Sequence, residues 1–295
     1  MVMVHYHIFK NGGSTIDYVL DREFGVNFRT LHGPDPTSIM TGSDLRKFLT
    51  DHPGLQAVSS HHLRYPTWRD QNSPVIDACM LRHPLDRLSS VYRYLRNRHL
   101  VSNDPLCEAA RQLSIQSFFA FCLDRYSSWV QNVQVAWLTF SGGHEGNLSY
   151  ALAELKEINL LGTLDQFDES LSTWEYALAP IFPGISLHYL TQNMTGSPQA
   201  TLATRLEMLR QICGPGLFNE LSAANSSDLE LFEVGSSIVQ ERFRRRPDSD
   251  CWLVEFQERN RRLEFTCRTS FRARIRNRIF HNSRKRRIPH AVSEL

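Results

Sequence analysis

A lysine, two adjacent glycines and two hydroxyl side chains follow the first apolar segment of this 295-residue chain. Residues 2–8 alternate in polarity as a strand does, and apolar residues from Ile16 to Phe24 recur at helical spacing. Glycines let a backbone approach a ligand, and the N–H groups that begin a helix point at any anion bound there. The turn is therefore predicted to bind a phosphate-like group through Lys10, Asn11, Gly12, Gly13, Ser14 and Thr15.

A second anion-binding residue is predicted where a later apolar run ends. Residues 75–81 predict a buried strand, Arg82 follows it directly, and Pro84 is suited to open a helix. Open α/β sheets bind their ligands at the carboxyl ends of the strands. Ser90 lies eight residues after Arg82, about two helical turns further on. The guanidinium fork of Arg82 and the hydroxyl of Ser90 predict a second phosphate contact.

The order of residues in the turn differs from that of the nucleotide P-loop. The P-loop, GxxxxGK[ST], places its lysine after the last glycine, whereas Lys10 precedes Gly12. That order disfavours a magnesium-nucleotide phosphotransferase without excluding it. Taken singly, the turn also fits an ordinary strand–turn–helix, and Arg82 also fits a structural ion pair.

Together the two segments resemble the donor-binding signatures of sulfotransferases that use 3′-phosphoadenosine 5′-phosphosulfate (PAPS). HIFKNGGST at residues 7–15 is similar to the 5′-phosphosulfate loop HxPKTGGT, and LRHPLDRLSSVYRYLRN at residues 81–97 to the 3′-phosphate segment LRxPxxRxxSxYxxxR. Further stretches are similar in the same order, at residues 59–65, 132–138, 158–171 and 226–235. The resemblance covers residues 5 to about 245. It is closest to the glycan sulfotransferases, including the heparan sulfate 2-O-sulfotransferase type and its bacterial relatives.

The resemblance implies a P-loop-like nucleotide-binding architecture, PAPS as donor, and sulfuryl transfer to a hydroxyl of a carbohydrate or related acceptor. In-line transfer places charge on the departing phosphate oxygen, so Lys10 and backbone donors belong beside that oxygen. Arg82 and Ser90 would hold the 3′-phosphate. Neither a metal nor a nucleic-acid substrate is expected. The chain departs from the family pattern at Phe9, Asn11 and Phe232, which replace the usual proline, threonine and tyrosine.

Histidine is the natural base for an acceptor hydroxyl near neutral pH. His61 and His62 follow a short apolar piece, residues 55–58, so they are expected at a strand end near the donor site. The resembling branch has its base in this segment, which favours His61, with His62 orienting the substrate or sharing the role. Arg64, Tyr65 and Arg69 are candidate contacts for an anionic sugar.

The elements that must position these residues alternate between strand-like and helical patterns. The sequence therefore predicts a single α/β domain, residues 1–257, with a mostly parallel central sheet flanked by helices. A late strand is expected at residues 185–189, and residues 104–137 are predicted to be helical. Ser227 with Glu230 predicts a capping box at a later helix. His5 and His7 flank the first strand and are expected to be structural.

Positive charge is concentrated at the end of the chain. Residues 258–290 carry twelve arginines and lysines against two acids, although the whole chain has a formal net charge of only +2. Residues 258–295 are therefore predicted to be a basic extension that contacts polyanions or an anionic membrane surface, or one that only aids solubility. A non-catalytic polyanion-binding protein is the corresponding alternative function. No long apolar run or signal-peptide pattern is present, so a cytoplasmic location is expected.

Overall fold

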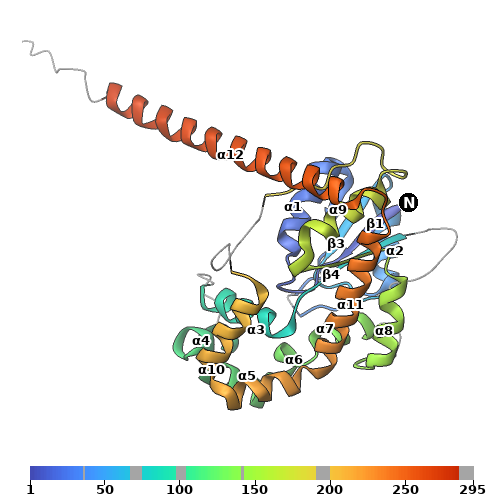
Figure 1. Cartoon of the computed structure of the whole chain (residues 1–295), viewed down its shortest axis with the longest axis vertical. Helices are drawn as coiled ribbons and strands as arrows, with labels where there is room; N and C mark the ends of the chain where they lie inside the picture. The colour runs from blue at the N-terminus through green and yellow to red at the C-terminus, as the bar shows by residue number, and fades with distance from the viewer. Residues whose placement is uncertain (36, 67–74, 98–103, 141–142, 191–199, 286–295) are drawn as a thin grey trace, which may run out of the picture.

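The computed structural model describes all of the chain except residues 36, 67–74, 98–103, 141–142, 191–199 and 286–295, and describes residues 268–285 by their backbone only. Its centre is a five-stranded, all-parallel sheet in the order β2-β3-β1-β4-β5 (Figure 1). The strands are β1 (Val2–Tyr6), β2 (Phe28–Thr30), β3 (Ala57–Ser60), β4 (Val75–Leu81) and β5 (Leu160–Thr163). The predicted α/β class with a parallel sheet is confirmed.

Helices cover both faces of this sheet. On one face lie α1 and α9 with the start of α12, and on the other lie α2, α7, α8 and α11, while α3, α4, α5 and α10 pack together beside the sheet (Figure 1). Their bounds are α1 (Gly13–Phe24), α2 (Gly42–Asp51), α3 (Pro84–Asn97), α4 (Pro105–Gln112), α5 (Ile115–Arg125), α6 (Ser127–Val130), α7 (Val133–Thr139), α8 (Leu148–Glu157), α9 (Phe167–Leu178), α10 (Leu202–Ala224), α11 (Ser226–Arg244) and α12 (Ser249–Lys285). The predicted helix opening at Pro84 and the predicted helical character of residues 104–137 are both confirmed for the described residues.

Alternation along β1 explains the two layers. Val4 and Tyr6 join the core formed with α7, α8 and α11, whereas Met3 joins the core formed with α1 and α9. All three side chains are fully buried. A parallel sheet needs cover on both faces, because its strands are apolar on both sides. His5 lies on the same face of β1 as Met3, so its side chain is directed toward α1.

The carboxyl ends of the strands bring the predicted site residues to one edge. The turn with Lys10 follows β1, His61 follows β3, and Arg82 follows β4. Strands β3 and β4 flank β1 on its two sides, so the chain passes across β1 between them. Crevices at such crossing points are where open α/β sheets bind ligands.

The late strand predicted at residues 185–189 is wrong. This segment runs outside the sheet, and side chains bond its backbone in place of a neighbouring strand. The Ser186 N–H donates to Glu23 and the Leu187 N–H donates to Glu175, at 2.9 and 2.7 Å. Alternating apolar residues here reflect packing against α1 and α9 and not pairing in a ladder.

The capping box predicted from Ser227 and Glu230 is also wrong. Helix α11 begins one residue earlier, at Ser226, and its N-cap is Asn225. The Asp228 N–H donates instead to the side-chain oxygen of Asn132, at 3.0 Å. A contact with a residue distant in sequence therefore satisfies one of the first amides of α11, and no side-chain cap forms at the start of this helix.

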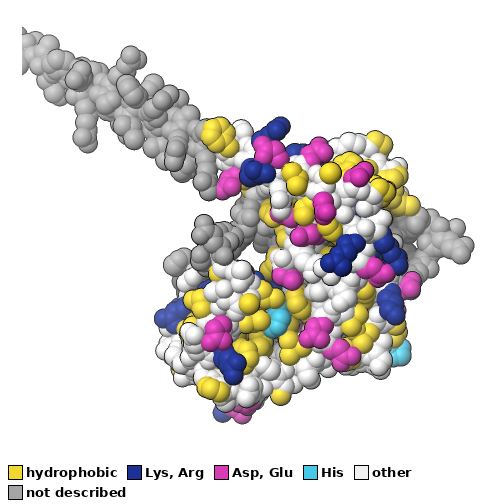
Figure 2. Space-filling model, in the orientation of Figure 1, with side chains coloured by type: hydrophobic (Ala, Val, Ile, Leu, Met, Phe, Trp, Pro, Cys, Tyr) yellow, Lys and Arg dark blue, Asp and Glu magenta, His cyan; other side chains and the backbone are white. Residues whose placement is uncertain are grey.

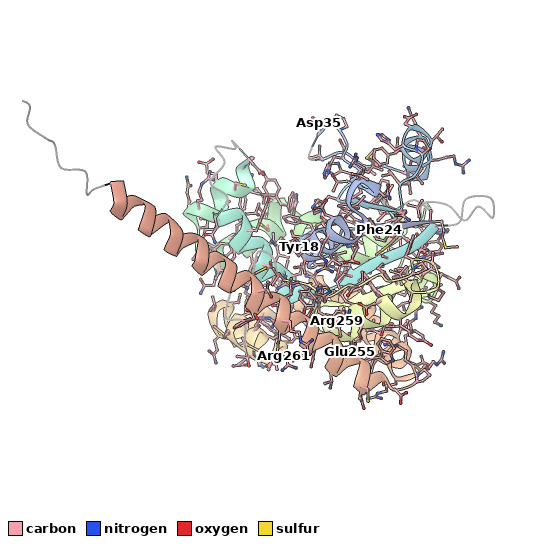
Figure 3. All side chains as sticks on the ribbon, turned by 90° about the horizontal axis from the view of Figure 1, so that it is seen from above. Tyr18, Phe24, Asp35, Glu255, Arg259 and Arg261 are labelled. Carbon is pink, nitrogen blue, oxygen red and sulfur yellow. The ribbon has the colours of Figure 1, made fainter. Side chains whose placement is uncertain are left out.

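Helix α12 crosses the predicted boundary between residues 257 and 258. Arg259 pairs with Glu175 of α9 at 2.6 Å, and Asn260 accepts the Tyr189 N–H at 2.7 Å. Figure 3 shows Glu255, Arg259 and Arg261 on this part of α12. Beyond it, α12 continues away from the sheet and its covering helices (Figure 1). The basic extension thus begins as the continuation of a helix whose first turns are anchored on the domain.

The surface carries charges of both signs. On the face shown in Figure 2, arginines and lysines are interspersed with acidic side chains over the described part of the molecule. Within the described residues, no helix combines the length and the apolar character needed to cross a membrane.

We expect Asp228→Ala to lower the free energy of unfolding by about 3 kcal/mol. The Asp228 carboxylate is 1% exposed and accepts the N–H groups of Gln134 and Val135 at 3.0 and 2.8 Å. Its loss would leave two buried donors at the start of α7 unpaired and remove the charge that faces Arg87. Urea unfolding at pH 7 measures the effect. The exposed neighbour Glu230→Ala should change stability by less than about 0.5 kcal/mol, and equal losses would contradict this role for Asp228.

Candidate functional site

The turn after β1 leaves backbone donors at the start of α1 uncapped. Lys10 and Gly12 have positive φ angles of 69° and 83°, and α1 begins at Gly13. Among the described residues, no acceptor pairs with the N–H groups of Gly12, Gly13 or Ser14, and the N-cap residue offers no side chain. These amides and the positive end of the helix dipole favour an anion at this point.

Lys10 adds a cation without a carboxylate partner among the described residues. Its ammonium lies 4.6 Å from the ring centroid of Tyr94 and 5.7 Å from that of Phe9. Burial, followed by repulsion from Arg82 and Arg93, lowers the pKa of Lys10 to about 8. Lys10 is still mostly protonated at pH 7, so this part of the fold holds a charge that a bound anion would neutralise.

Arg82 lies directly against the turn. Its Nη1 donates to the carbonyl of Lys10 and its Nε donates to Asp86 Oδ2, both at 2.8 Å. Arg205 of α10 donates to both oxygens of the same carboxylate, at 2.8 and 3.1 Å. Burial opposes ionisation of Asp86, but Arg82 and Arg205 outweigh it and lower the pKa of this carboxyl. One buried carboxylate therefore orients two arginines beside the Lys10 turn.

Gln134 connects the turn to the end of β4. The Asn11 side-chain amide donates to Gln134 Oε1 at 2.7 Å and to the carbonyl of Met80 at 2.8 Å. The same Gln134 oxygen accepts the Arg82 N–H at 3.0 Å, and Gln134 Nε2 donates back to the Arg82 carbonyl at 2.8 Å. Asn11 and Gln134 are almost fully buried. The side-chain amide of Asn11 is thus used inside the protein, and its backbone N–H donates to the Ile8 carbonyl at 3.2 Å, so Asn11 offers no free N–H donor to an anion.

The remaining predicted anion contacts differ in exposure. Ser14 is exposed, Thr15 is 4% exposed, and Ser90 on α3 is also 4% exposed. The space beside Gly13 is filled by His7, because a Cβ on Gly13 would lie 2.0 Å from the His7 ring. The absence of a side chain at Gly13 therefore makes room for the His7 imidazole, whereas the sequence predicted that it makes room for a ligand.

The rings of His61 and His7 pack against each other beside this turn, tilted by 36°. The two ring centroids are 3.6 Å apart, and His61 Nδ1 lies 3.0 Å from the backbone carbonyl of His7. A carbonyl only accepts hydrogen bonds, so Nδ1 carries the proton and Nε2 keeps its lone pair. Burial, followed by the charge of His7, lowers the pKa of His61 to about 3. His61 is therefore neutral at physiological pH and has one ring nitrogen able to accept a proton.

His62 is held by a different part of the chain. Its Nδ1 accepts the Gly33 N–H at 2.7 Å, and its ring lies 5.9 Å from that of His32. The structure therefore separates the two candidate histidines, and it is His61 that contacts a residue of the Lys10 turn.

The three residues predicted as candidate contacts for an anionic sugar lie in different environments or outside the described residues. The Arg64 guanidinium lies 3.6 Å from the ring centroid of Trp137 and donates to the carbonyl of His61 at 3.1 Å. Tyr65 is fully buried against Tyr6, so the expectation that it contacts an acceptor is wrong. Arg69 lies outside the described residues.

Sequence reasoning missed Asp17, which faces His5 of β1 and His7, the residue that directly follows β1. Its carboxylate pairs with His5 Nδ1 at 3.3 Å and with His7 Nδ1 at 2.9 Å, and it accepts a hydrogen bond from Ser59. Ligand atoms of His5, His7 and Asp17 lie within 4.8 Å of one another, close enough to hold a metal ion. In this structure, hydrogen bonds join His5 Nδ1 and His7 Nδ1 to the carboxylate of Asp17. The His-x-His spacing with an acid on the following helix was the available sequence signal.

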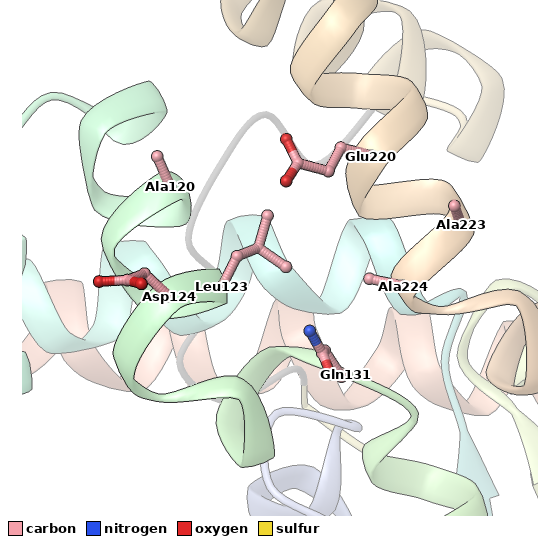
Figure 4. Close-up of a pocket in the computed structure, with 7 residues that line it drawn as sticks. All are labelled: Ala120, Leu123, Asp124, Gln131, Glu220, Ala223 and Ala224. Atoms are coloured by element: carbon pink, nitrogen blue, oxygen red, sulfur yellow. The ribbon is translucent and has the colours of Figure 1, made fainter.

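A separate hollow lies between α5 and the end of α10 (Figure 4). Leu123 and small alanine side chains line it together with Gln131 and the carboxylates of Asp124 and Glu220. Two carboxylates oppose the binding of a polyanionic donor, so this hollow is distinct in chemistry from the Lys10 turn.

Comparison with known proteins leaves the family open. No protein-family model matches the chain. The chain is similar to a protein of Archaeoglobus fulgidus (strain ATCC 49558 / DSM 4304 / JCM 9628 / NBRC 100126 / VC-16) described as an uncharacterized protein. The two are 25% identical over 251 residues, which cover 82% of this chain and 99% of the relative. The relative's description gives no activity.

We expect Lys10→Met to raise the free energy of unfolding by about 1 kcal/mol at pH 7, because it removes a buried charge. The pKa of Lys10 is lowered on folding to about 8 from 10.5, so the penalty is full below pH 8 and disappears as pH rises above 10.5. The extra free energy of unfolding of Lys10→Met should therefore decrease to zero between pH 8 and pH 10.5. Urea unfolding across this pH range measures it.

Lys47→Met is the matched control for this prediction. The Lys47 side chain is 77% exposed, and its pair with Asp51 lies on the surface of α2. Its replacement should change stability by less than about 0.5 kcal/mol at every pH. A destabilised Lys10→Met at pH 7 would contradict the view that the Lys10 charge lacks a carboxylate partner among the described residues.

Proposed function

We propose that this chain is a sulfotransferase that moves a sulfuryl group from PAPS to a hydroxyl of a carbohydrate or related acceptor. The observation that carries the proposal is the Lys10 turn: a partly buried lysine without a carboxylate partner among the described residues, beside the uncapped start of a helix. The resemblance of residues 7–15 and 81–97 to the donor-binding segments of PAPS-dependent enzymes supplies the choice of donor.

The 5′-phosphosulfate and the 3′-phosphate of the donor are assigned to two different sets of residues. Lys10 and the N–H groups of Gly12, Gly13 and Ser14 would hold the 5′-phosphosulfate. Arg82, with Ser90 two turns further along α3, would hold the 3′-phosphate. The bidentate pair of Arg205 with Asp86 supports Arg82 in this role, because it fixes the carboxylate that orients the guanidinium.

In the proposed reaction, His61 takes the proton of the acceptor hydroxyl, and the phosphate oxygen of the donor takes the electron pair of the broken bond. Nε2 of His61 accepts the proton of the attacking hydroxyl, and the acceptor oxygen forms the new bond to sulfur. The bond from sulfur to the phosphate oxygen breaks, and its electron pair stays on that oxygen. Lys10 and the backbone donors stabilise this developing charge. The chemistry requires no metal.

The wider assignments follow from this proposal and the basic extension. The acceptor is expected to be a glycan, and arginines and lysines of residues 258–295 would contact a polyanion or an anionic membrane surface. No nucleic acid is proposed as substrate, and a cytoplasmic location remains the expectation from sequence.

We expect 3′,5′-ADP (PAP) to stabilise the protein more than AMP or ATP does, because only PAP carries a 3′-phosphate. At 100 times its dissociation constant, PAP should add about 2.7 kcal/mol to the free energy of unfolding. Arg82→Ala should reduce this response to that of AMP. Thermal unfolding with each nucleotide measures the difference.

Arg111→Ala is the control for the Arg82 variant, because Arg111 is exposed on α4. It should keep the full response to PAP. A PAP response that survives in Arg82→Ala would remove Arg82 from the 3′-phosphate site. Magnesium-dependent turnover of ATP without any response to PAP would favour a phosphotransferase instead.

We expect His61→Gln to keep its response to PAP and to lose sulfuryl transfer by about 100-fold or more, because the proton acceptor is removed. His62→Gln should keep transfer within about threefold, since His62 faces Gly33. Transfer of radiolabelled sulfate from PAPS to a panel of glycan, lipid and phenolic acceptors measures the rate. Full activity of His61→Gln would exclude His61 as the base.

A further inference from the structure

Asp17 and His7 form a polar chain behind His61. Asp17 of α1 pairs with His7 Nδ1 at 2.9 Å, and the His7 ring packs against the His61 ring with centroids 3.6 Å apart. His61 in turn donates its Nδ1 proton to the His7 carbonyl at 3.0 Å. His7 thus contacts the candidate base through both its ring and its backbone.

His7 has little freedom to move. It is 4% exposed, and the edge of its ring fills the space beside Gly13, where a Cβ would lie 2.0 Å from it. On its other side, its ring stacks with that of His5 at 5.3 Å. Asp17, Gly13 and His5 therefore fix the surface on which His61 rests, and this surface adjoins the start of α1.

Asp17 also provides a negative charge in direct contact with His5 and His7. Of the groups that act electrostatically on His61, His5 and His7 oppose its protonation, whereas the Asp17 carboxylate favours it. Burial opposes ionisation of Asp17, but hydrogen bonds from His5 and His7 outweigh it and hold the pKa of Asp17 far below its ordinary value. Asp17 therefore remains an anion at every pH at which the enzyme would work.

We propose that Asp17, acting through His7, is a positioning residue that holds His61 with Nε2 free and compensates the charge that His61 gains during transfer. This inference rests on the proposed function. The acceptor's O–H bond breaks, its proton bonds to Nε2 of His61, and the Nδ1 proton stays on His61, hydrogen-bonded to the His7 carbonyl. Asp17 keeps its negative charge throughout, opposite the new imidazolium.

Asp17→Asn tests the proposal, because it removes the charge and keeps nearly the same shape. We expect kcat to fall by about 100-fold, while KM for PAPS and the affinity for PAP change by less than about twofold. Asp17→Glu, which restores the charge, should recover part of the lost rate. Rates are divided by the concentration of PAP-binding sites, so that loss of folded protein alone does not lower kcat.

Asp21→Asn is the matched control. Asp21 lies one turn further along α1 and is exposed, so its variant should keep the wild-type kcat. A kcat for Asp17→Asn within about twofold of wild type would overturn the proposal. So would an equal fall in Asp21→Asn, or a fall that Asp17→Glu deepens.

A second measurement does not depend on transfer. Nitrogen NMR of the imidazoles should show His61 protonated at Nδ1 and bare at Nε2 in the wild-type protein, and a mixture of the two forms in Asp17→Asn. An unchanged tautomer in the variant would overturn the positioning role. Should the wild-type protein neither respond to PAP nor transfer sulfate, the proposed function fails, while the tautomer still decides whether Asp17 orients His61.

Discussion

The hydrogen bonds that join the β1 turn to the end of β4 are the contacts on which the rest of the site depends. Gln134 accepts from both Asn11 and Arg82, and Arg82 donates to the carbonyl of Lys10. These bonds are buried, where unmade hydrogen bonds are costly. They fix the backbone that carries the free N–H groups and place the arginine beside it. The sheet brings the two segments together, because β1 and β4 pair directly, and these bonds fix how the residues after each strand lie against one another.

The same region is where the fold accepts an energetic cost. Lys10 is held in a partly buried position without a carboxylate, near Arg82 and Arg93, and its pKa is lowered accordingly. A protein selected only for stability would remove this charge or pair it. The supporting arginines are balanced by one buried carboxylate, Asp86, which orients them without reaching Lys10 itself. A partly buried positive charge without a carboxylate partner, such as that of Lys10, is typical of a site that binds an anion.

Local patterns predicted the core elements well and the periphery poorly. The strand at residues 75–81 and the helix opening at Pro84 were predictable, because a continuous apolar run and a proline at the first helical position are strong local signals. The segment at residues 185–189 alternates equally well. It forms no strand, because Glu23 and Glu175 take its amides and the described sheet does not extend to it. The helix start near Ser227 was displaced by a contact with Asn132 for the same kind of reason.

The amino-acid sequence by itself determined the strand that precedes Lys10, the strand at residues 75–81 that precedes Arg82, the helices that follow both, and the position of His61 just after a short apolar piece. These features depend on periodicity and on residue types that act over a few neighbouring positions. Only the tertiary structure decided that His61 contacts the turn while His62 faces Gly33, and that Asp17 lies behind the histidines. Adjacent residues on a bending chain point in different directions, and the packing of β1 against α1 selects between them. The spacing of residues along the sequence does not show which of the two histidines contacts the turn.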